Sequence, residues 1–139
     1  LDKKRILEVI QNLKKADEAI IVSVNNYLKK SVSLGGSSTI KVKTKIFKKA
    51  PVEIQYRIIS KLCRLVGNKD KVPRSKSLQS LIDKINTGDF RSHTLNGCIF
   101  VSKSDEILIS KEKRRSRFLG QNFRVILENK DWPKLIEHY

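Results

Sequence analysis

The chain has 139 residues, which is the size of a single domain, and its 30 Lys and Arg residues against 14 Asp and Glu give a formal net charge of +16. A hydrophobic content of 39% is too high for a disordered chain, and no apolar run is long enough to cross a membrane. Two cysteines exclude a disulfide framework, so we expect a reducing, cytoplasmic location. The sequence starts with Leu and contains no Met, which indicates a piece of a longer protein.

The excess of positive charge favours a polyanionic partner, because each neutralised phosphate releases counterions and adds affinity. Codon bias would raise the lysine content without lowering the number of acidic residues. We therefore expect a nucleic acid, ahead of a membrane surface or an acidic protein.

Residues 2–30 are predicted to form one long helix. Ile6, Ile10, Leu13, Ile20 and Val24 follow a spacing of three and four that Asp17 interrupts once, and the segment contains neither Pro nor Gly. Such a helix can be a spacer between domains or an ordinary core helix, and both interpretations stay open. The segment that follows, SVSLGGSS at 31–38, predicts a loop and completes a first region, residues 1–38.

Alternation of apolar and polar residues over 39–44 predicts a strand. Its polar side continues as a run of lysines, and residues 39–50 carry five positive charges and no negative one. This segment therefore carries only positive charge, which makes it a candidate for binding phosphate groups.

Two short amphipathic helices are predicted over residues 51–88. Pro51 and Glu53 suit the start of the first helix, and Gly67 its end. Ser75 opens the second helix, which stops at Gly88. With a polar turn between them, these helices form a helical hairpin.

A small antiparallel β-meander is predicted next, with strands at 90–95, 98–102 and 107–110. Asn96-Gly97 is a strong signal for a tight hairpin between the first two strands. The fold class is therefore α+β, and residues 39–112, which hold the helical hairpin and the β-meander, form the central domain. Residues 113–139 carry a basic segment, a further strand at 121–128 and a short tail, the start of a C-terminal element.

No active site is predicted. His93 and His138 have no neighbouring nucleophile or carboxylate pair, and Cys63 lies among apolar helix residues, as a buried core residue would. Metal-ligand spacings are missing, so we expect no metal site. The glycines at 35–36 follow a helix and precede a strand, which is the wrong context for a phosphate-binding Walker loop.

The candidate nucleic-acid-binding residues are the basic ones that cluster in sequence. Arg57, Lys61 and Arg64 lie at i, i+4 and i+7, so one helix face would carry all three. Aromatic residues make up only 6%, which favours contacts to the backbone of a folded RNA over stacking on unpaired bases. The full set is Lys41, Lys43, Lys45, Lys48, Lys49, Arg57, Lys61, Arg64, Arg74, Lys76, Lys113, Arg114, Arg115 and Arg117.

Four short segments, in this order, resemble the C-terminal side of bacterial tRNA(Ile)-lysidine synthetases. They are PVEIQYRII at 51–59, PRSK at 73–76, LNGCIFV at 95–101 and ILISKE at 107–112. The long helix and the loop after it resemble the linker and central region that follow the catalytic domain of that family. The resemblance covers most of residues 1–112.

The resemblance implies a parent protein with an N-terminal, Rossmann-like ATP-pyrophosphatase domain followed by smaller tRNA-recognition domains. Such an enzyme uses ATP and magnesium to adenylate the wobble cytidine of the isoleucine tRNA with a CAU anticodon, and free lysine then displaces AMP. The family's Ser-Gly-Gly-x-Asp-Ser signature is missing, because SLGGSS at 33–38 lacks the Asp. We therefore expect no catalytic residue and no cofactor in this chain.

What the resemblance transfers to this chain is a role in positioning tRNA, with residues 39–112 as the tRNA-binding domain. Arg57, Arg74 and Lys76 fall within the resembling segments, and their contact with tRNA is inferred from charge. The oligomeric state of the parent stays open, a homodimer included. Two other functions are also open: a non-enzymatic DNA-binding module with a helix-turn-helix at 51–88, and a protein-interaction scaffold.

Overall fold

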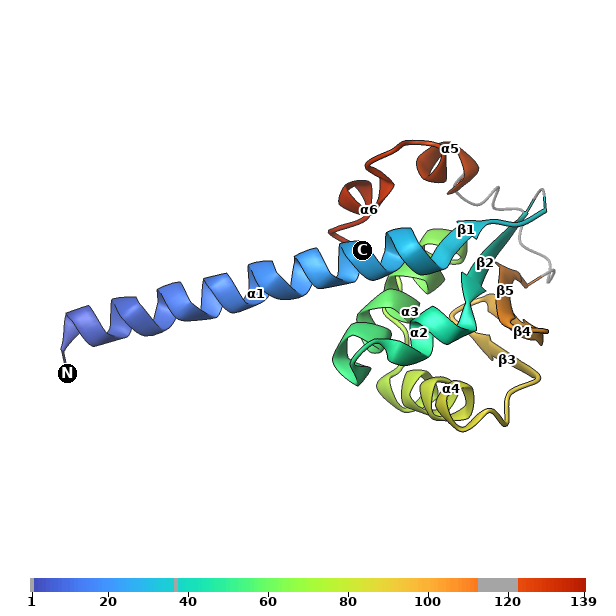
Figure 1. The fold of residues 1–139 in the computed structure, drawn as a ribbon, viewed down its shortest axis with the longest axis horizontal. Helices are drawn as coiled ribbons and strands as arrows, with labels where there is room; N and C mark the ends of the chain where they lie inside the picture. Colours follow the sequence, from blue (N-terminus) through green and yellow to red (C-terminus); the bar gives the residue numbers. More distant parts are fainter. Residues whose placement is uncertain (1, 37, 113–122) are drawn as a thin grey trace.

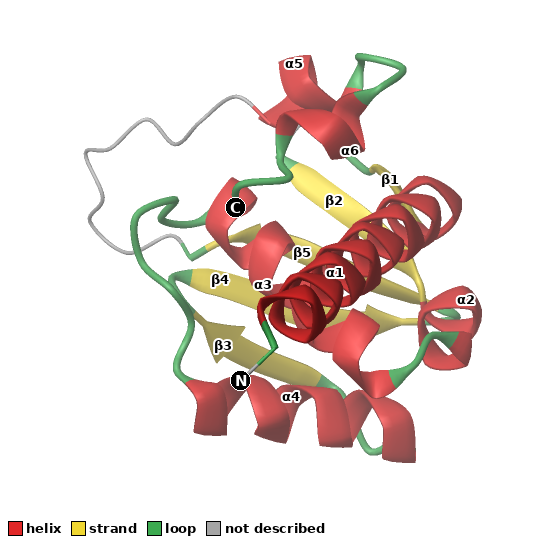
Figure 2. Ribbon diagram, turned by 90° about the vertical axis from the view of Figure 1, so that its left-hand side faces the viewer, coloured by secondary structure: helices red, strands yellow, loops and turns green. Residues whose placement is uncertain are grey.

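The computed structural model describes residues 2–36, 38–112 and 123–139. It has the expected α+β class: a long N-terminal helix, several shorter helices and an open, five-stranded antiparallel sheet with strand order β1-β2-β5-β4-β3. Helices α1, α3 and α4 lie on one side of this sheet (Figures 1 and 2). No helix among the described residues is long and apolar enough to cross a membrane.

The first helix, α1 (Lys3–Ser31), consists of two halves with different surroundings. Asp2 caps it by accepting a hydrogen bond from the backbone N–H of Lys4 at 3.1 Å. Every residue from 2 to 19 is exposed, whereas Val24, Leu28 and Ser31 are buried against the body of the protein. Figure 1 shows the N-terminal half projecting away from that body. The core-helix interpretation is thus confirmed for the second half only.

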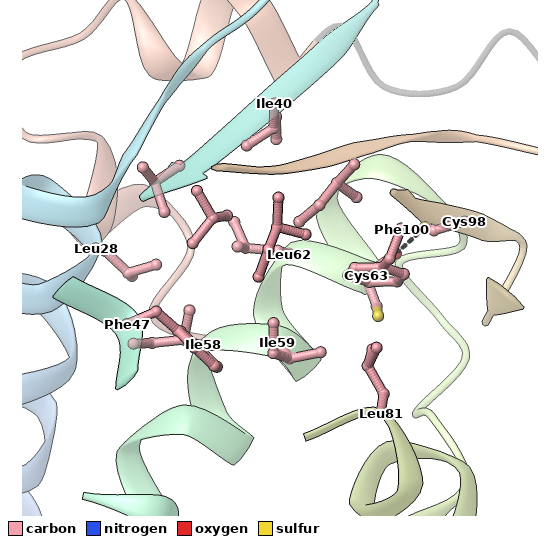
Figure 3. Close-up of a cluster of buried hydrophobic side chains, with 14 of the residues drawn as sticks. Leu28, Ile40, Phe47, Ile58, Ile59, Leu62, Cys63, Leu81, Cys98 and Phe100 are labelled. Atoms are coloured by element: carbon pink, nitrogen blue, oxygen red, sulfur yellow. Dashed lines mark hydrogen bonds between the residues drawn. The ribbon is translucent and has the colours of Figure 1, made fainter. Parts of the chain in front are cut away.

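The predicted helical hairpin is confirmed as α3 (Val52–Val66) and α4 (Ser75–Thr87). Helix α3 is the centre of the core: Ile58, Ile59 and Leu62 are fully buried between the sheet and the other helices (Figure 3). Gly88 ends α4 with a φ of 78°, a left-handed conformation that glycine adopts without steric cost.

The β-meander is confirmed as β3 (Ser92–Leu95), β4 (Cys98–Lys103) and β5 (Glu106–Lys111). Asn96 and Gly97 both have positive φ, 56° and 78°, as a two-residue hairpin turn requires. The predicted strand at 39–44 is β2 (Thr39–Lys43), which pairs with β5 and so extends the meander.

Two elements were not predicted. Part of the expected loop at 31–38 forms β1 (Val32–Leu34), which directly follows α1 and pairs with β2. The chain reverses direction at the glycines, where the backbone N–H of Gly35 donates to the carbonyl of Thr39 at 2.7 Å. The lysine run forms α2 (Thr44–Lys49). At the start of α2 the backbone N–H of Thr44 donates to the carbonyl of Asp105, just beyond the last residue pair of β2 and β5. The buried Phe47 packs this short helix against the core.

The predicted strand at 121–128 is wrong over its described part, which is the helix α5 (Phe123–Leu127). Phe123, Ile126 and Leu127 pack against the core at helical spacing, while Val125 points outward, so tertiary packing selects the helix over local strand propensity. The tail forms α6 (Trp132–Leu135), and both Trp132 and the following Ile136 are buried. The basic candidates Lys113, Arg114, Arg115 and Arg117 lie outside the described residues.

Candidate nucleic-acid interface

Helix α2 presents three of the predicted lysines on one short exposed element. Lys45, Lys48 and Lys49 are exposed, and the fully buried Phe47 between them anchors the helix to the core. We call these three lysines the α2 ridge. Because the backbone under the ridge is fixed by Phe47, the flexible lysine stems can move while their attachment points stay in place.

A cavity of about 270 Å³ lies on one side of the ridge. It is bordered by Thr44, Lys45 and Lys48 from α2, by the residues that follow α4, and by the β4–β5 turn with Ser104 and Asp105. Two ammonium groups and several hydroxyl donors suit an anionic group such as a phosphate, and Asp105 is the one acidic residue among the lining residues.

A second cavity, of about 520 Å³, lies on the other side of the ridge, between α1 and α2. Its walls combine two cations, Lys30 and Lys49, with the ring of Tyr27 and the polar side chains of Ser23 and Asn26. Ammonium groups for a phosphate, an aromatic surface and amide donors are the contacts that a nucleotide uses. This cavity could not be predicted from the sequence, since its residues come from two segments about 20 positions apart.

The two lysines of β2 lie next to the ridge but beside an acidic residue. Lys41 Nζ is 3.9 Å from Glu106 Oε2, and Lys43 pairs in register with Glu106, which pairs on its other side with Lys103. Three lysines thus surround one carboxylate, so the end of the sheet next to α2 keeps a net positive charge.

The predicted row on α3 is engaged in contacts within the protein. Arg57 Nε lies 3.1 Å from Glu53 Oε1, and Arg64 Nε donates to the carbonyl of Lys69 at 2.7 Å. Lys61 Nζ donates to the backbone carbonyls of Ile136 and Glu137 at 3.0 and 2.8 Å. Burial lowers the pKa of Lys61, Glu137 raises it, and Arg57 and Arg64 lower it further. The role of this row in binding nucleic acid stays a prediction.

Arg74 and Lys76 are exposed at the start of α4, whereas the first cavity borders the end of that helix. A 13-residue helix is about 20 Å long, so these two residues are separate from the α2 ridge. Of the described candidates, the structure therefore gathers the lysines of 41–49 and leaves the other two groups apart.

Nothing in the described residues resembles a catalytic centre. Cys63 and Cys98 are both buried, and Cys98 Sγ donates to the carbonyl of Cys63 at 3.3 Å (Figure 3). Interaction of the Cys63 side chain with that of Cys98, together with burial, raises the pKa of the Cys63 thiol, which keeps it protonated and unreactive. Burial and the nearby Lys84 lower the pKa of His93. No group of three potential metal ligands occurs in the part of the chain that the structure describes.

Comparison with known proteins gives a partial match. No family model and no solved structure matches the chain. A curated protein matches part of the chain. It is a tRNA(Ile)-lysidine synthase of Orientia tsutsugamushi (strain Boryong), 30% identical over 114 residues that cover 79% of this chain and 25% of that protein. The chain thus spans about a quarter of the length of the relative it matches, and it is similar to one region of a synthase of the family that its motifs resemble.

Proposed function

We propose that this chain is a tRNA-binding region of a tRNA(Ile)-lysidine synthase-like ligase and that it holds tRNA through the surface around α2. The observation that carries the proposal is the α2 ridge between two cavities, in a segment with five lysines and no acidic residue. The similarity to part of a tRNA-modifying enzyme supports tRNA as the polyanion.

Lysine ammonium groups on flexible stems bind phosphates as point charges and do not read bases. A ridge of this kind fits the phosphate backbone of a folded RNA, which presents closely spaced charges on a defined shape. In this proposal the chain fixes the orientation of the tRNA, and a separate catalytic domain of the parent acts on the isoleucine tRNA with the CAU anticodon.

The reaction also requires ATP and magnesium, and the described residues do not fit either group. Gly35 and Gly36 lie in a turn between β1 and β2, not between a strand and a helix as a nucleotide-binding loop would. No cluster of carboxylates is available for a divalent cation among the described residues. We assign these sites to the remainder of the parent protein and derive no chemical step from this chain.

The first experiment measures tRNA affinity as a function of salt concentration. If about six phosphates are contacted, the affinity falls roughly a thousandfold between 50 and 200 mM salt. Changing Lys45, Lys48 and Lys49 together to Gln should reduce the salt slope by about three, since each lost phosphate contact removes about one.

The matched control changes three exposed lysines away from α2, Lys71, Lys130 and Lys134, to Gln, which gives the same loss of charge. Equal effects of the two triple variants, or an affinity that does not depend on salt, would contradict the proposal. Competition with duplex DNA separates the alternative function: a DNA-binding module would be displaced from tRNA by DNA at equal phosphate concentration.

A further inference from the structure

The second cavity, between α1 and α2, differs from the first in having no acidic residue among its described lining residues. Its volume of about 520 Å³ falls within the range of small-ligand pockets, about 300–1,000 Å³. Helix α2 lies beside the last turns of α1, where the walls of this cavity meet (Figures 1 and 2). Phosphate contacts to the α2 ridge alone do not fill this space, so room remains for a further group of the ligand.

One face of α1 supplies four of the lining residues. They follow the helical spacing i, i+3, i+4 and i+7: Ser23, Asn26, Tyr27 and Lys30. The half-buried ring of Tyr27 also packs against the core, so it is held in place at the cavity wall. A fixed aromatic ring is the kind of surface on which an unpaired base stacks.

Helix α2 supplies the rest of the wall with Ile46 and Lys49. Ile46 is half-buried and adds an apolar surface next to the space that the ring borders. The ammonium groups of Lys30 and Lys49, one from each helix, border the same space. The cavity therefore combines a surface for a base with two cations for a phosphate.

The charges around the cavity suit a phosphate. Residues 19–52 contain seven lysines and no Asp or Glu. The ion pairs within the described residues lie elsewhere, so in that part of the chain no carboxylate is within 4 Å of Lys30 or Lys49. A phosphate at this site therefore meets no competing carboxylate of the described residues.

We propose that this cavity binds a single unpaired nucleotide of the RNA. The base lies against Tyr27 and Ile46, the phosphate lies between the two ammonium groups, and the amide and hydroxyl groups of the α1 face bind the base edges that an unstacked nucleotide exposes. The low aromatic content argues against a row of stacked bases, but one ring is enough for one base. This inference rests on the proposed function and deepens it, because the cavity selects RNA with a nucleotide outside the helical stack.

The test compares two RNA hairpins with the same number of phosphates, one fully paired and one with a single bulged adenosine, by fluorescence anisotropy. The chain should bind the bulged hairpin about tenfold more tightly, as expected for one base stacked on an aromatic ring. Tyr27→Leu should abolish this preference, whereas Tyr27→Phe keeps the ring and should retain it. Tyr56→Leu is the matched control, because Tyr56 is also half-buried against the core but does not line the cavity.

A second pair of variants tests the phosphate contact. Lys30→Gln should weaken binding of the bulged hairpin and reduce its salt slope by about one. Lys29→Gln is its control, since it removes the same charge from an exposed neighbour that does not line the cavity. If Tyr27→Leu fails to fold by circular dichroism, this pair and the wild-type preference decide the outcome.

Three results would overturn the inference: equal effects of Tyr27→Leu and Tyr56→Leu, equal effects of Lys30→Gln and Lys29→Gln, or no preference for the bulged hairpin. A wild-type chain that binds tRNA but shows no such preference would leave the proposed function intact. A chain that binds neither the hairpins nor tRNA would overturn both.

Discussion

Lys61 was expected from its charge to face a nucleic acid, but in the structure it makes hydrogen bonds within the protein. Spacing alone places Lys61 in an outward-facing row. In the structure its ammonium group donates to two backbone carbonyls of the C-terminal segment and so joins that segment to α3. Asn25 adds a second link by donating to Glu137 Oε1 at 3.0 Å. The sequence could not indicate these contacts, because they join residues that are 75 or more positions apart.

Lys61→Met should lower the free energy of unfolding by about 1–2 kcal/mol, because two carbonyls lose a charged hydrogen-bond donor while the aliphatic stem is kept. Urea unfolding measures the change. Lys71→Met, at an exposed position, should stay within about 0.5 kcal/mol of the wild type. Equal stability of the two variants would mean that the Lys61 contacts do not stabilise the C-terminal segment, and Lys61 would then be available to bind RNA.

At the scale of elements, the sequence predicts those whose signals are local. Asn96-Gly97 specifies its own hairpin turn, and Gly88 specifies the end of α4, because both act through the backbone conformation of one or two residues. The strand expected at 121–128 is wrong over residues 123–127 because the helix there depends on a surface supplied by distant residues. Charge alone selects the lysines of 45–49 as binding candidates, and that role stays a prediction. The helix α2 and the two cavities beside it depend on tertiary contacts, which local sequence does not indicate.

The junction between α3 and the β3–β4 hairpin depends on Gly67. A Cβ atom at this position would lie 2.5 Å from the carbonyl oxygen of Asn96 and 2.8 Å from that of Cys63, and both are backbone atoms that cannot rotate away. Gly67→Ala should therefore cost about 2–3 kcal/mol by forcing the helix and the hairpin apart.

Thermal unfolding of Gly67→Ala and of a control, Gly36→Ala, checks this prediction. A Cβ at Gly36 would have no atom within 4 Å, so the control should stay within about 0.5 kcal/mol of the wild type. A neutral Gly67→Ala would mean that the hairpin packs less closely against α3 than the structure has it.

At the scale of the molecule, the basic candidates among the described residues lie in separate groups. These groups are the ridge with its neighbouring β2 lysines, the α3 row, whose Lys61 contacts the C-terminal segment, and the start of α4. The first group is exposed on α2 and borders both cavities described above, which is why the proposed tRNA contact is assigned to it. The net charge was evident from composition, but its division among these surfaces depends on the tertiary fold.

The last prediction separates the projecting half of α1 from the folding unit. A chain that starts at Asp17 loses every fully exposed turn of the helix and keeps a residue that suits a helix cap. Its free energy of unfolding should stay within about 1 kcal/mol of that of the full chain, because none of the removed residues belongs to the core or packs against it. Deleting residues 132–139 instead removes the buried Trp132 and Ile136 and should cost on the order of 5 kcal/mol.

The two deletions are compared by urea unfolding. The N-terminal deletion should leave the unfolding transition cooperative and its midpoint close to that of the full chain, whereas the C-terminal deletion should lower the midpoint. If the N-terminal deletion destabilises the body as much as the C-terminal deletion does, the projecting half of α1 is part of the folding unit. A stable body locates the folding unit in residues 17–139 and leaves the surface around α2 available for RNA.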